Sequence, residues 1–467
     1  MKQFLRLSGT LALIISFLCL ANISSSAQRK SPNIVLIVSD DMGYGDIGIH
    51  GSRDTLTPNI DALSRVATRF TDAYVSGPYC SPTRAGLLTG RYPQRFGYEF
   101  NPDRVGTIHQ EIGLPVGETT VADYFKSAGY RTALFGKWHL GDEEEYHPMS
   151  RGFDEFFGFL GGDHSYVDPE TSGPDPLLEG RKPVTKTDYL TDVFTDRAID
   201  FIKRQRTQPF FLYVAYNAVH TPLQAPDKYL DRFSKIADPT RRTYAAMLSA
   251  MDDGIGRIMA ALRDSGLEEN TLVIFFNDNG GPTMQGTTIN GSSNAPLRGS
   301  KRQTWEGGIR VPFFIRWKGR LPEGKLDSRP IIQLDVLPTA LAAAGIKPKP
   351  QSNLDGVNLL PFITGKSRGL PHEALYWRLG ENMAIRRGDW KLVKAVEGRL
   401  YDADSNAADY LSGVQLYNVA NDIGENRNLA AENPAKVKEL VAAWNAWNKE
   451  LAKPLWGPKP RPASEKR

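Results

Sequence analysis

Long apolar runs alternate with helical patterns through the first three quarters of the chain. Three runs are almost free of polar residues, as expected of strands buried on both faces: residues 33–38, 210–216 and 271–276. Further strands are expected at 130–135 and 311–317, and helices at 57–67, 120–128, 243–262 and 335–344. This alternation predicts an α/β fold with a large, mostly parallel mixed sheet flanked by helices.

The pattern changes after about residue 370. Short alternating segments there predict a small antiparallel sheet, at residues 384–387, 390–394 and 415–418, and a helix is expected at 434–451. We therefore predict three parts after the leader: a large N-terminal domain over residues 28–370, a smaller C-terminal α+β subdomain over 371–453, and a flexible tail over 454–467.

Residues 1–27 have the three parts of a signal peptide. Lys2 and Arg6 give a positive start, residues 11–21 are apolar, and small residues at 25–27 offer a cleavage site. The apolar run is too short for a membrane anchor, so we expect an exported protein, periplasmic or secreted. Removing the two basic residues of the leader lowers the net charge from +4 to +2, which does not indicate nucleic-acid binding.

One cysteine remains once the leader is removed. The chain has two, and Cys19 lies in the leader, so Cys80 has no partner for an internal disulfide. Ser81 and Pro82 are typical of an N-cap and a first helical residue, which would put Cys80 at a helix N-terminus where anions are favoured. Arg84 could turn back to the same place and hold an oxyanion.

Polar residues follow four of the predicted strands. In open α/β sheets, ligands bind at the carboxyl ends of the strands, so these residues are expected to share one site. They are Asp40 and Asp41, Lys137 and His139, His220, and Asp278 and Asn279. The oxygen ligands among them suit a hard cation, Ca²⁺ or Mg²⁺, rather than zinc.

Each of these features also has a simpler interpretation. The Asp pairs could be turn residues, and each histidine could be structural. Lys137 and Lys301 could be ordinary surface lysines. The G-x-G-x-x-G match at residues 43–48 indicates no dinucleotide site, because Asp40 and Asp41 would repel a pyrophosphate. A low-pKa Cys80 thiolate paired with histidine would be a nucleophile, but a hard cation prefers oxygen to sulfur.

The motifs together closely resemble those of the type I, formylglycine-dependent sulfatases of the alkaline phosphatase superfamily. The signature reads Cys80-Ser-Pro-Thr-Arg84, followed by Leu88-Thr-Gly-Arg91. The other matches are Asp40-Asp41, Gly136-Lys-Trp-His-Leu-Gly141, His220-Thr-Pro222, Asp278-Asn-Gly280 and Leu297-Arg-Gly-Ser-Lys301. The middle and C-terminal regions look most like the galactosamine-sulfatase and bacterial polysaccharide-sulfatase branches.

The resemblance implies a modified cysteine and a metal. A formylglycine-generating maturation enzyme would oxidise Cys80 to formylglycine (3-oxoalanine), whose hydrate is both an oxygen nucleophile and a metal ligand. The expected cation is Ca²⁺, in preference to Mg²⁺. Its ligands by position are Asp40, Asp41, Asp278, Asn279 and the modified Cys80.

The resemblance also implies the catalytic roles. Arg84 would hold the formylglycine. His220 and Lys301 would contact the leaving oxygen, with His220 as the proton donor. Lys137 and His139 would assist loss of a proton from the second hydroxyl, which expels sulfate and regenerates the aldehyde.

The expected substrate is a sulfated carbohydrate. We expect exo-action on galactose- or galactosamine-type glycans or on algal polysaccharide fragments. His164, Arg95 and Arg378 are suggested sugar contacts, although each could be a solvated loop residue. Two alternatives stay open: a phosphate or phosphonate ester hydrolase of the same superfamily, and a non-catalytic protein that binds sulfated glycans. The sequence gives no indication of the oligomeric state.

Overall fold

The computed structural model describes residues 31–102, 112–171, 175–205, 207–395 and 411–457. The predicted signal peptide, residues 1–27, lies outside these ranges, as does most of the predicted tail. From Pro32 onward the chain forms one compact unit, so the subdomain boundary at residue 371 stays a prediction. None of the helices in the described ranges has both the length and the apolar character that crossing a bilayer requires.

The large sheet has ten strands, in the order β11-β2-β10-β9-β1-β8-β4-β5-β6-β7. Their bounds are β1 Asn33–Ser39, β2 Thr68–Phe70, β4 Arg131–Lys137, β5 Glu155–Phe159, β6 Leu177–Glu179, β7 Lys182–Val184, β8 Phe210–Ala215, β9 Thr271–Asn277, β10 Phe313–Arg316 and β11 Leu326–Asp327. The five central strands β9, β1, β8, β4 and β5 are mutually parallel, while β10 pairs antiparallel with β9 and β2. The prediction of a large mixed, mostly parallel sheet is confirmed.

Two apolar cores lie on the two faces of this sheet. In β1, Ile34 and Leu36 belong to one core, and Val35 and Ile37 belong to the other. Because both alternating faces of the strand are buried, its sequence is a continuous apolar run.

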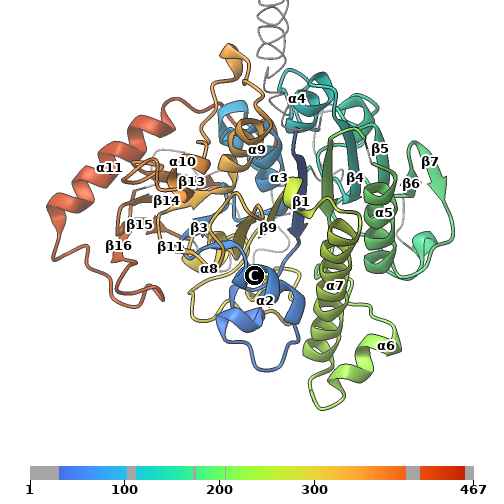
Figure 1. Ribbon diagram of the computed structural model, residues 1–467. Helices are drawn as coiled ribbons and strands as arrows, with labels where there is room; N and C mark the ends of the chain where they lie inside the picture. The colour runs from blue at the N-terminus through green and yellow to red at the C-terminus, as the bar shows by residue number, and fades with distance from the viewer. Residues whose placement is uncertain (1–30, 103–111, 172–174, 206, 396–410, 458–467) are drawn as a thin grey trace, which may run out of the picture. The chain divides into compact units, whose positions relative to one another are not determined.

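Helices from different parts of the chain cover the two faces (Figure 1). One core takes residues from α3 (Cys80–Thr89), α4 (Val121–Ser127) and α9 (Val336–Ala344). The other takes residues from α2 (Pro58–Arg65), α5 (Leu190–Arg204) and α7 (Pro239–Asp264). Three further helices are single turns: α6 (Asp227–Leu230), α8 (Glu306–Ile309) and α10 (Leu360–Ile363).

A smaller antiparallel sheet forms a third core. Its strands are β13 (Leu375–Leu379), β14 (Asn382–Arg387), β15 (Trp390–Lys394) and β16 (Gln415–Asn418), and α11 (Pro434–Asn448) packs on it through Leu440 and Trp444. The predicted small antiparallel sheet and helix are confirmed. Two further short strands, β3 (Ala73–Tyr74) and β12 (Ile331–Ile332), pair in parallel.

Two local predictions need correction. Helix α3 begins at Cys80 with Tyr79 as its N-cap, so Ser81 is a residue of the first turn and not the cap. The predicted flexible tail begins too early, because Trp456 is only 5% exposed and its indole N–H donates to Phe100 O and Asn101 O. A buried, hydrogen-bonded tryptophan fixes this part of the segment to the core.

Candidate active site

The predicted site residues meet at the carboxyl edge of the large sheet. Strands β9, β1, β8 and β4 are parallel neighbours, so the residues that follow them leave the sheet on the same side. Ser39 is paired with Asn277, which places Asp40 next to Asp278. The next loop positions, Asp41 and Asn279, are joined by a hydrogen bond of 2.7 Å from the Asn279 amide to Asp41 Oδ1.

Arg84 connects the first turn of α3 to these strand ends. It donates from Nε and Nη2 to Asp278 Oδ2 at 3.1 and 2.8 Å, and Nη2 lies 3.4 Å from Asp40 Oδ2. Its Nη1 donates to Lys137 O at 3.2 Å and to the Tyr213 hydroxyl at 3.4 Å. The guanidinium is 1% exposed, so a single planar group ties α3 to β1, β4, β8 and β9.

Two buried lysines pair with the two adjacent aspartates. Lys137 Nζ lies 2.5 Å from Asp40 Oδ2, and Lys301 Nζ lies 2.8 Å from Asp41 Oδ2. The interpretation of Lys137 and Lys301 as ordinary surface lysines is therefore wrong, because both side chains are buried. Burial opposes ionisation of Asp40, but the charges of Lys137 and its cationic neighbours outweigh burial and hold the pKa of that carboxyl well below its usual range.

Strand β4 reaches the site through a glycine. Gly136 has φ 120°, and a Cβ there would lie 1.9 Å from Ala215 O of the neighbouring strand. The close approach of β4 to β8 therefore requires glycine at the position just before Lys137. His139 follows with φ 63°, a backbone conformation that few residues with a side chain adopt.

The donor set fits a hard divalent cation. Ligand atoms of Asp40, Asp41, Cys80 and His220 all lie within 4.8 Å of one another. Among the residues that the structure describes, Asp40 Oδ1 and Asn279 Oδ1 are buried oxygens without a hydrogen-bond partner. Burial and the charge of Asp40 raise the pKa of Asp278 to about 7, despite the nearby Arg84. The residues thus offer unpaired oxygen atoms, and a nearby cation would favour the ionised form of Asp278. Both features are expected of a Ca²⁺ or Mg²⁺ site.

Cys80 is a neutral thiol in this environment. Burial raises its pKa to about 12, although the charges of Lys137 and Lys301 act in the opposite direction. The side chain is 1% exposed. The alternative of an activated, low-pKa thiolate is therefore wrong, because at neutral pH almost none of this thiol would be ionised.

The two site histidines are held in the neutral form. Burial lowers the pKa of His139 well below its ordinary value, and the charges of Lys137 and Arg84 lower it further. Burial and the charge of Lys301 also lower the pKa of His220. His220 Nδ1 lies 2.7 Å from Thr221 O, so Nδ1 carries the hydrogen and Nε2 faces Asp41 Oδ2 at 3.4 Å.

The three suggested sugar contacts lie in different surroundings. His164 is 2% exposed and stacks on Phe159, and its Nε2 is buried with no hydrogen-bond partner in the part of the chain that the structure describes. Arg95 is paired with Asp355 and Glu450, and Arg378 is paired with Glu99. The arginines thus have local carboxylate partners, and a role in sugar binding stays a prediction for all three residues.

Several residues that support the site were not predicted. Asn290 donates to Asp41 O and Val219 O, which joins the loops after β1 and β8. Tyr213 lies inside an apolar strand, and its hydroxyl contacts Arg84. Ser81 donates to His139 O at 2.5 Å. A tyrosine in an otherwise apolar buried strand is a usable signal, because a buried hydroxyl needs a partner. Asn290 carries no such mark in the sequence.

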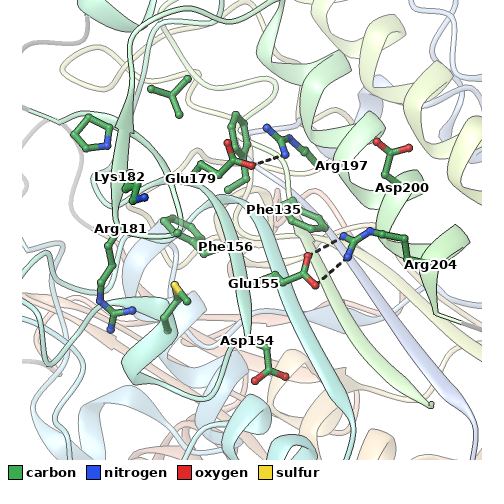
Figure 2. A pocket seen from close by; sticks show the side chains of 15 residues that line it. Phe135, Asp154, Glu155, Phe156, Glu179, Arg181, Lys182, Arg197, Asp200 and Arg204 are labelled. Atoms are coloured by element: carbon green, nitrogen blue, oxygen red, sulfur yellow. Dashed lines mark hydrogen bonds and ion pairs between the residues drawn. The ribbon is translucent and has the colours of Figure 1, made fainter. Parts of the chain in front are cut away.

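A separate cavity of about 1000 Å³ lies beside β5, the β6–β7 hairpin and α5 (Figure 2). Figure 2 shows two ion pairs among its lining residues, Arg204 with Glu155 and Arg197 with Glu179. None of its lining residues belongs to the strand-end cluster. The cavity therefore contributes nothing to the chemistry of that cluster.

Comparisons with known proteins identify relatives over most of the chain. Residues 32–346 match the family model described as Sulfatase. The N-acetylgalactosamine-6-sulfatase of Canis lupus familiaris is 34% identical over 396 residues, which are 81% of this chain and 74% of that protein. The arylsulfatase G of Rattus norvegicus is 35% identical over 405 residues, which are 77% of this chain and 73% of that protein.

Solved structures resemble the chain over nearly its whole length. The crystal structure of Ps i-CgsB in complex with k-i-k-neocarrahexaose has a TM-score of 0.83 and 36% identity, and the match covers 93% of this chain and 96% of that one. The phosphonate monoester hydrolase SpPMH from Silicibacter pomeroyi has a TM-score of 0.66 and covers 90% of this chain and 96% of that one. At 19% identity, the second likeness concerns the fold alone.

Proposed function

The chain belongs to the sulfatase family and is a sulfuric ester hydrolase, and from that premise we propose that its substrate is a sulfated glycan. One relative is named for N-acetylgalactosamine-6-sulfate hydrolysis, and a similar solved structure is described with neocarrahexaose bound. Both names support a carbohydrate substrate. We propose exo-action on galactose- or galactosamine-type glycans or on algal polysaccharide fragments.

The main support for the proposed mechanism is the environment of Cys80. A buried thiol with its pKa raised to about 12 lies among oxygen ligands, where sulfur suits neither the nucleophile nor a hard cation. Conversion of Cys80 to formylglycine removes both difficulties, because the hydrated aldehyde supplies an oxygen nucleophile that is also an oxygen ligand. We propose that a maturation enzyme makes this change during export directed by residues 1–27.

Asp40, Asp41, Asp278 and Asn279 would hold the cation together with the modified Cys80. Ca²⁺ is the proposed ion, since three carboxylates and an amide oxygen match its preferred ligands. When bound, the ion polarises the sulfate oxygens and aligns the sulfate with the nucleophile. Loss of activity on treatment with a chelator, with recovery on adding Ca²⁺ but not Zn²⁺, is the expected behaviour.

The remaining residues move protons and stabilise charge. Lys137 and Lys301 are fixed, buried cations beside the strand ends, placed to stabilise negative charge that develops on the transferred group. His220 carries its hydrogen on Nδ1, so a proton gained at Nε2 would be given to the leaving oxygen. A lowered pKa makes that protonated ring a stronger acid. His139, neutral beside Lys137, would accept the proton that must leave the nucleophile in the second step.

The decisive experiment is mass spectrometry of the Cys80 peptide from protein made in its native host. Conversion of a cysteine side chain to an aldehyde is expected, together with turnover of sulfate esters. Cys80→Ala should be inactive and otherwise folded. An unmodified thiol throughout an active preparation would contradict the formylglycine proposal.

Parallel assays separate the sulfatase from the two alternatives. The matured protein should cleave an aryl sulfate and a sulfated oligosaccharide with higher kcat/KM than the matching phosphate and phosphonate esters. A preference for phosphorus esters would overturn the assignment of substrate. Glycan binding without any ester cleavage by matured protein would favour the non-catalytic alternative.

A further inference from the structure

We propose that Trp456 is a positioning residue for the active site. It belongs to the C-terminal strap, defined here as residues 452–457, which follows α11. The strap runs against the segment 94–101. Ala452 N donates to Gln94 O at 3.1 Å, and Leu455 N donates to Gly97 O at 2.9 Å.

Trp456 anchors the strap to two residues of that segment. Its indole N–H donates to both Phe100 O and Asn101 O, at 3.1 and 3.0 Å. Its ring packs edge-on against Tyr98, with 4.8 Å between the ring centroids. Trp456 is 5% exposed and Tyr98 is fully buried. The indole therefore fixes the backbone at Asn101 and the ring of Tyr98 together.

Both of these residues contact Ser81, which follows Cys80. Asn101 Oδ1 accepts a hydrogen bond of 3.2 Å from Ser81 N. Ser81 lies in the first turn of α3, where a backbone N–H cannot bond to a carbonyl of its own helix. The Tyr98 hydroxyl lies 2.7 Å from Ser81 Oγ. Since Ser81 Oγ donates its own hydrogen to His139 O, Tyr98 is the donor in this second contact.

Two routes therefore lead from Trp456 to the site through Ser81, and the Tyr98 hydroxyl also donates directly to His139 O at 3.5 Å. One goes through Asn101 to the start of α3, which carries Cys80. The other goes through Tyr98 and the Ser81 hydroxyl to His139, whose φ of 63° needs support from its surroundings. Loosening the strap is thus expected to release Cys80 and His139 together, without removing any group that touches substrate.

The test uses the full mature chain with Cys80 left as a thiol, by production without a maturation enzyme. Cys80 is 1% exposed, so a small alkylating reagent such as iodoacetamide reacts only after local opening. Trp456→Phe keeps an aromatic ring and removes the indole N–H. We expect it to speed alkylation roughly fivefold to tenfold, as the loss of one N–H donor, shared between two carbonyl groups, implies.

The chain offers a matched control. Trp447 is also 5% exposed, but its indole N–H finds no hydrogen-bond acceptor within the described ranges of the chain. Trp447→Phe should leave the alkylation rate of Cys80 unchanged. Equal rates in Trp456→Phe, Trp447→Phe and the parent would overturn the proposal. So would faster alkylation that tracks the loss of global stability, measured by denaturant unfolding of the same variants.

A second pair of variants tests the Asn101 route. Asn101→Asp keeps the oxygen that caps Ser81 N, whereas Asn101→Ala removes it, so only the alanine variant should speed alkylation. In the matured enzyme, Trp456→Phe should lower kcat several-fold with KM unchanged. A change in KM alone would contradict a positioning role. The thiol measurement needs no turnover, so its result is independent of which ester the enzyme cleaves.

Discussion

At the scale of single residues, Arg84 has the most demanding environment. Its Nε and Nη2 both donate to Asp278 Oδ2, and its Nη1 donates to Lys137 O, with almost no solvent contact. An ammonium group carries the same charge but cannot reproduce this fork. Replacing Arg84 with lysine therefore tests whether the site requires the geometry of the guanidinium or only its charge.

We expect Arg84→Lys to lower kcat/KM roughly 100-fold and to cost about 2 kcal/mol of unfolding free energy, because Asp278 loses a two-point partner in a buried site. Steady-state kinetics and urea unfolding measure the two effects. Arg204→Lys is the control, since Arg204 is 55% exposed in its pair with Glu155. That change should alter stability by less than about 0.5 kcal/mol. Similar effects in both variants would contradict the argument.

The sequence located most single residues of the site but not their supports. Asp40, Asp278 and Lys137 follow recognisable strands, so their common position could be predicted. Serine before proline is a strong local signal, and it predicts a helix cap at Ser81. Its hydroxyl instead bonds to His139 O, a partner 58 positions away that no local pattern specifies. Tertiary contacts of this kind decide where α3 begins.

At the scale of elements, α7 caps α2. Asp252 of α7 is buried and accepts hydrogen bonds from Asn59 N at 3.1 Å and Ile60 N at 2.7 Å, in the first turn of α2. Thr57 at the N-cap position makes no side-chain cap of its own. Asp252, a residue far away in the sequence, thus supplies the hydrogen-bond acceptor that the N-terminus of α2 lacks locally.

We expect Asp252→Ala to cost about 2 kcal/mol of unfolding free energy, because two buried N–H groups lose their acceptor. Asp252→Asn keeps an oxygen acceptor and should cost less. Its neighbour on the same helix, Asp253, forms a half-exposed pair with Arg232, so Asp253→Ala should cost under about 1 kcal/mol. Denaturant unfolding ranks the three variants. Equal losses for Asp252→Ala and Asp253→Ala would exclude capping by Asp252.

Helices and strands with a clear apolar pattern in their own sequence could be predicted. Short strands that form only by pairing with another strand could not. The central strands β1, β8 and β9 are apolar runs, and the long helix α7 has clear spacing. By contrast, β2 and β11 are two or three residues long and form only through pairing with neighbouring strands, β2 with β10 and β11, and β11 with β2. Strand β13 was likewise missed, because its partner β14 provides the register.

At the scale of the whole molecule, a buried ion cluster joins the small sheet to the large core. Lys391 of β15 lies 2.9 Å from both Glu306 of α8 and Glu425. All three side chains are without solvent contact. Burial opposes ionisation of Glu306, but Lys391 and Arg310 lower its pKa to about 2. Burial and the charge of Glu306 raise the pKa of Glu425 to about 7, although the charge of Lys391 acts in the opposite direction.

This arrangement gives a pH dependence with a definite sign. The folded-state pKa of Glu425 is above the unfolded value of 4.5, so the folded state binds more protons between the two values. Stability therefore falls as pH rises from about 4.5 through about 7. Glu425→Gln removes this titration and keeps an oxygen for Glu306 N, which now donates to Glu425 Oε2 at 2.7 Å.

We expect the unfolding free energy of Glu425→Gln, relative to the parent, to rise by about 2 kcal/mol between pH 5 and pH 7.5. Guanidinium unfolding at a series of pH values measures this difference directly. Glu439→Gln is the control, because Glu439 lies on the surface of α11 beside Lys436 and Arg387. Parallel stability curves for the parent and Glu425→Gln would contradict the assignment.

The Cys80 thiol also provides a way to measure how much of a preparation is unconverted. The sequence has two cysteines, and Cys19 lies in the predicted leader, so under the proposed processing a chain would carry one sulfhydryl before conversion of Cys80 to formylglycine and none after it. Titration with a chromogenic thiol reagent in denaturant, where Cys80 is no longer buried, then gives the immature fraction as moles of thiol per mole of chain. Dividing a measured rate by the remaining fraction converts the activity of a mixed preparation into turnover per competent molecule.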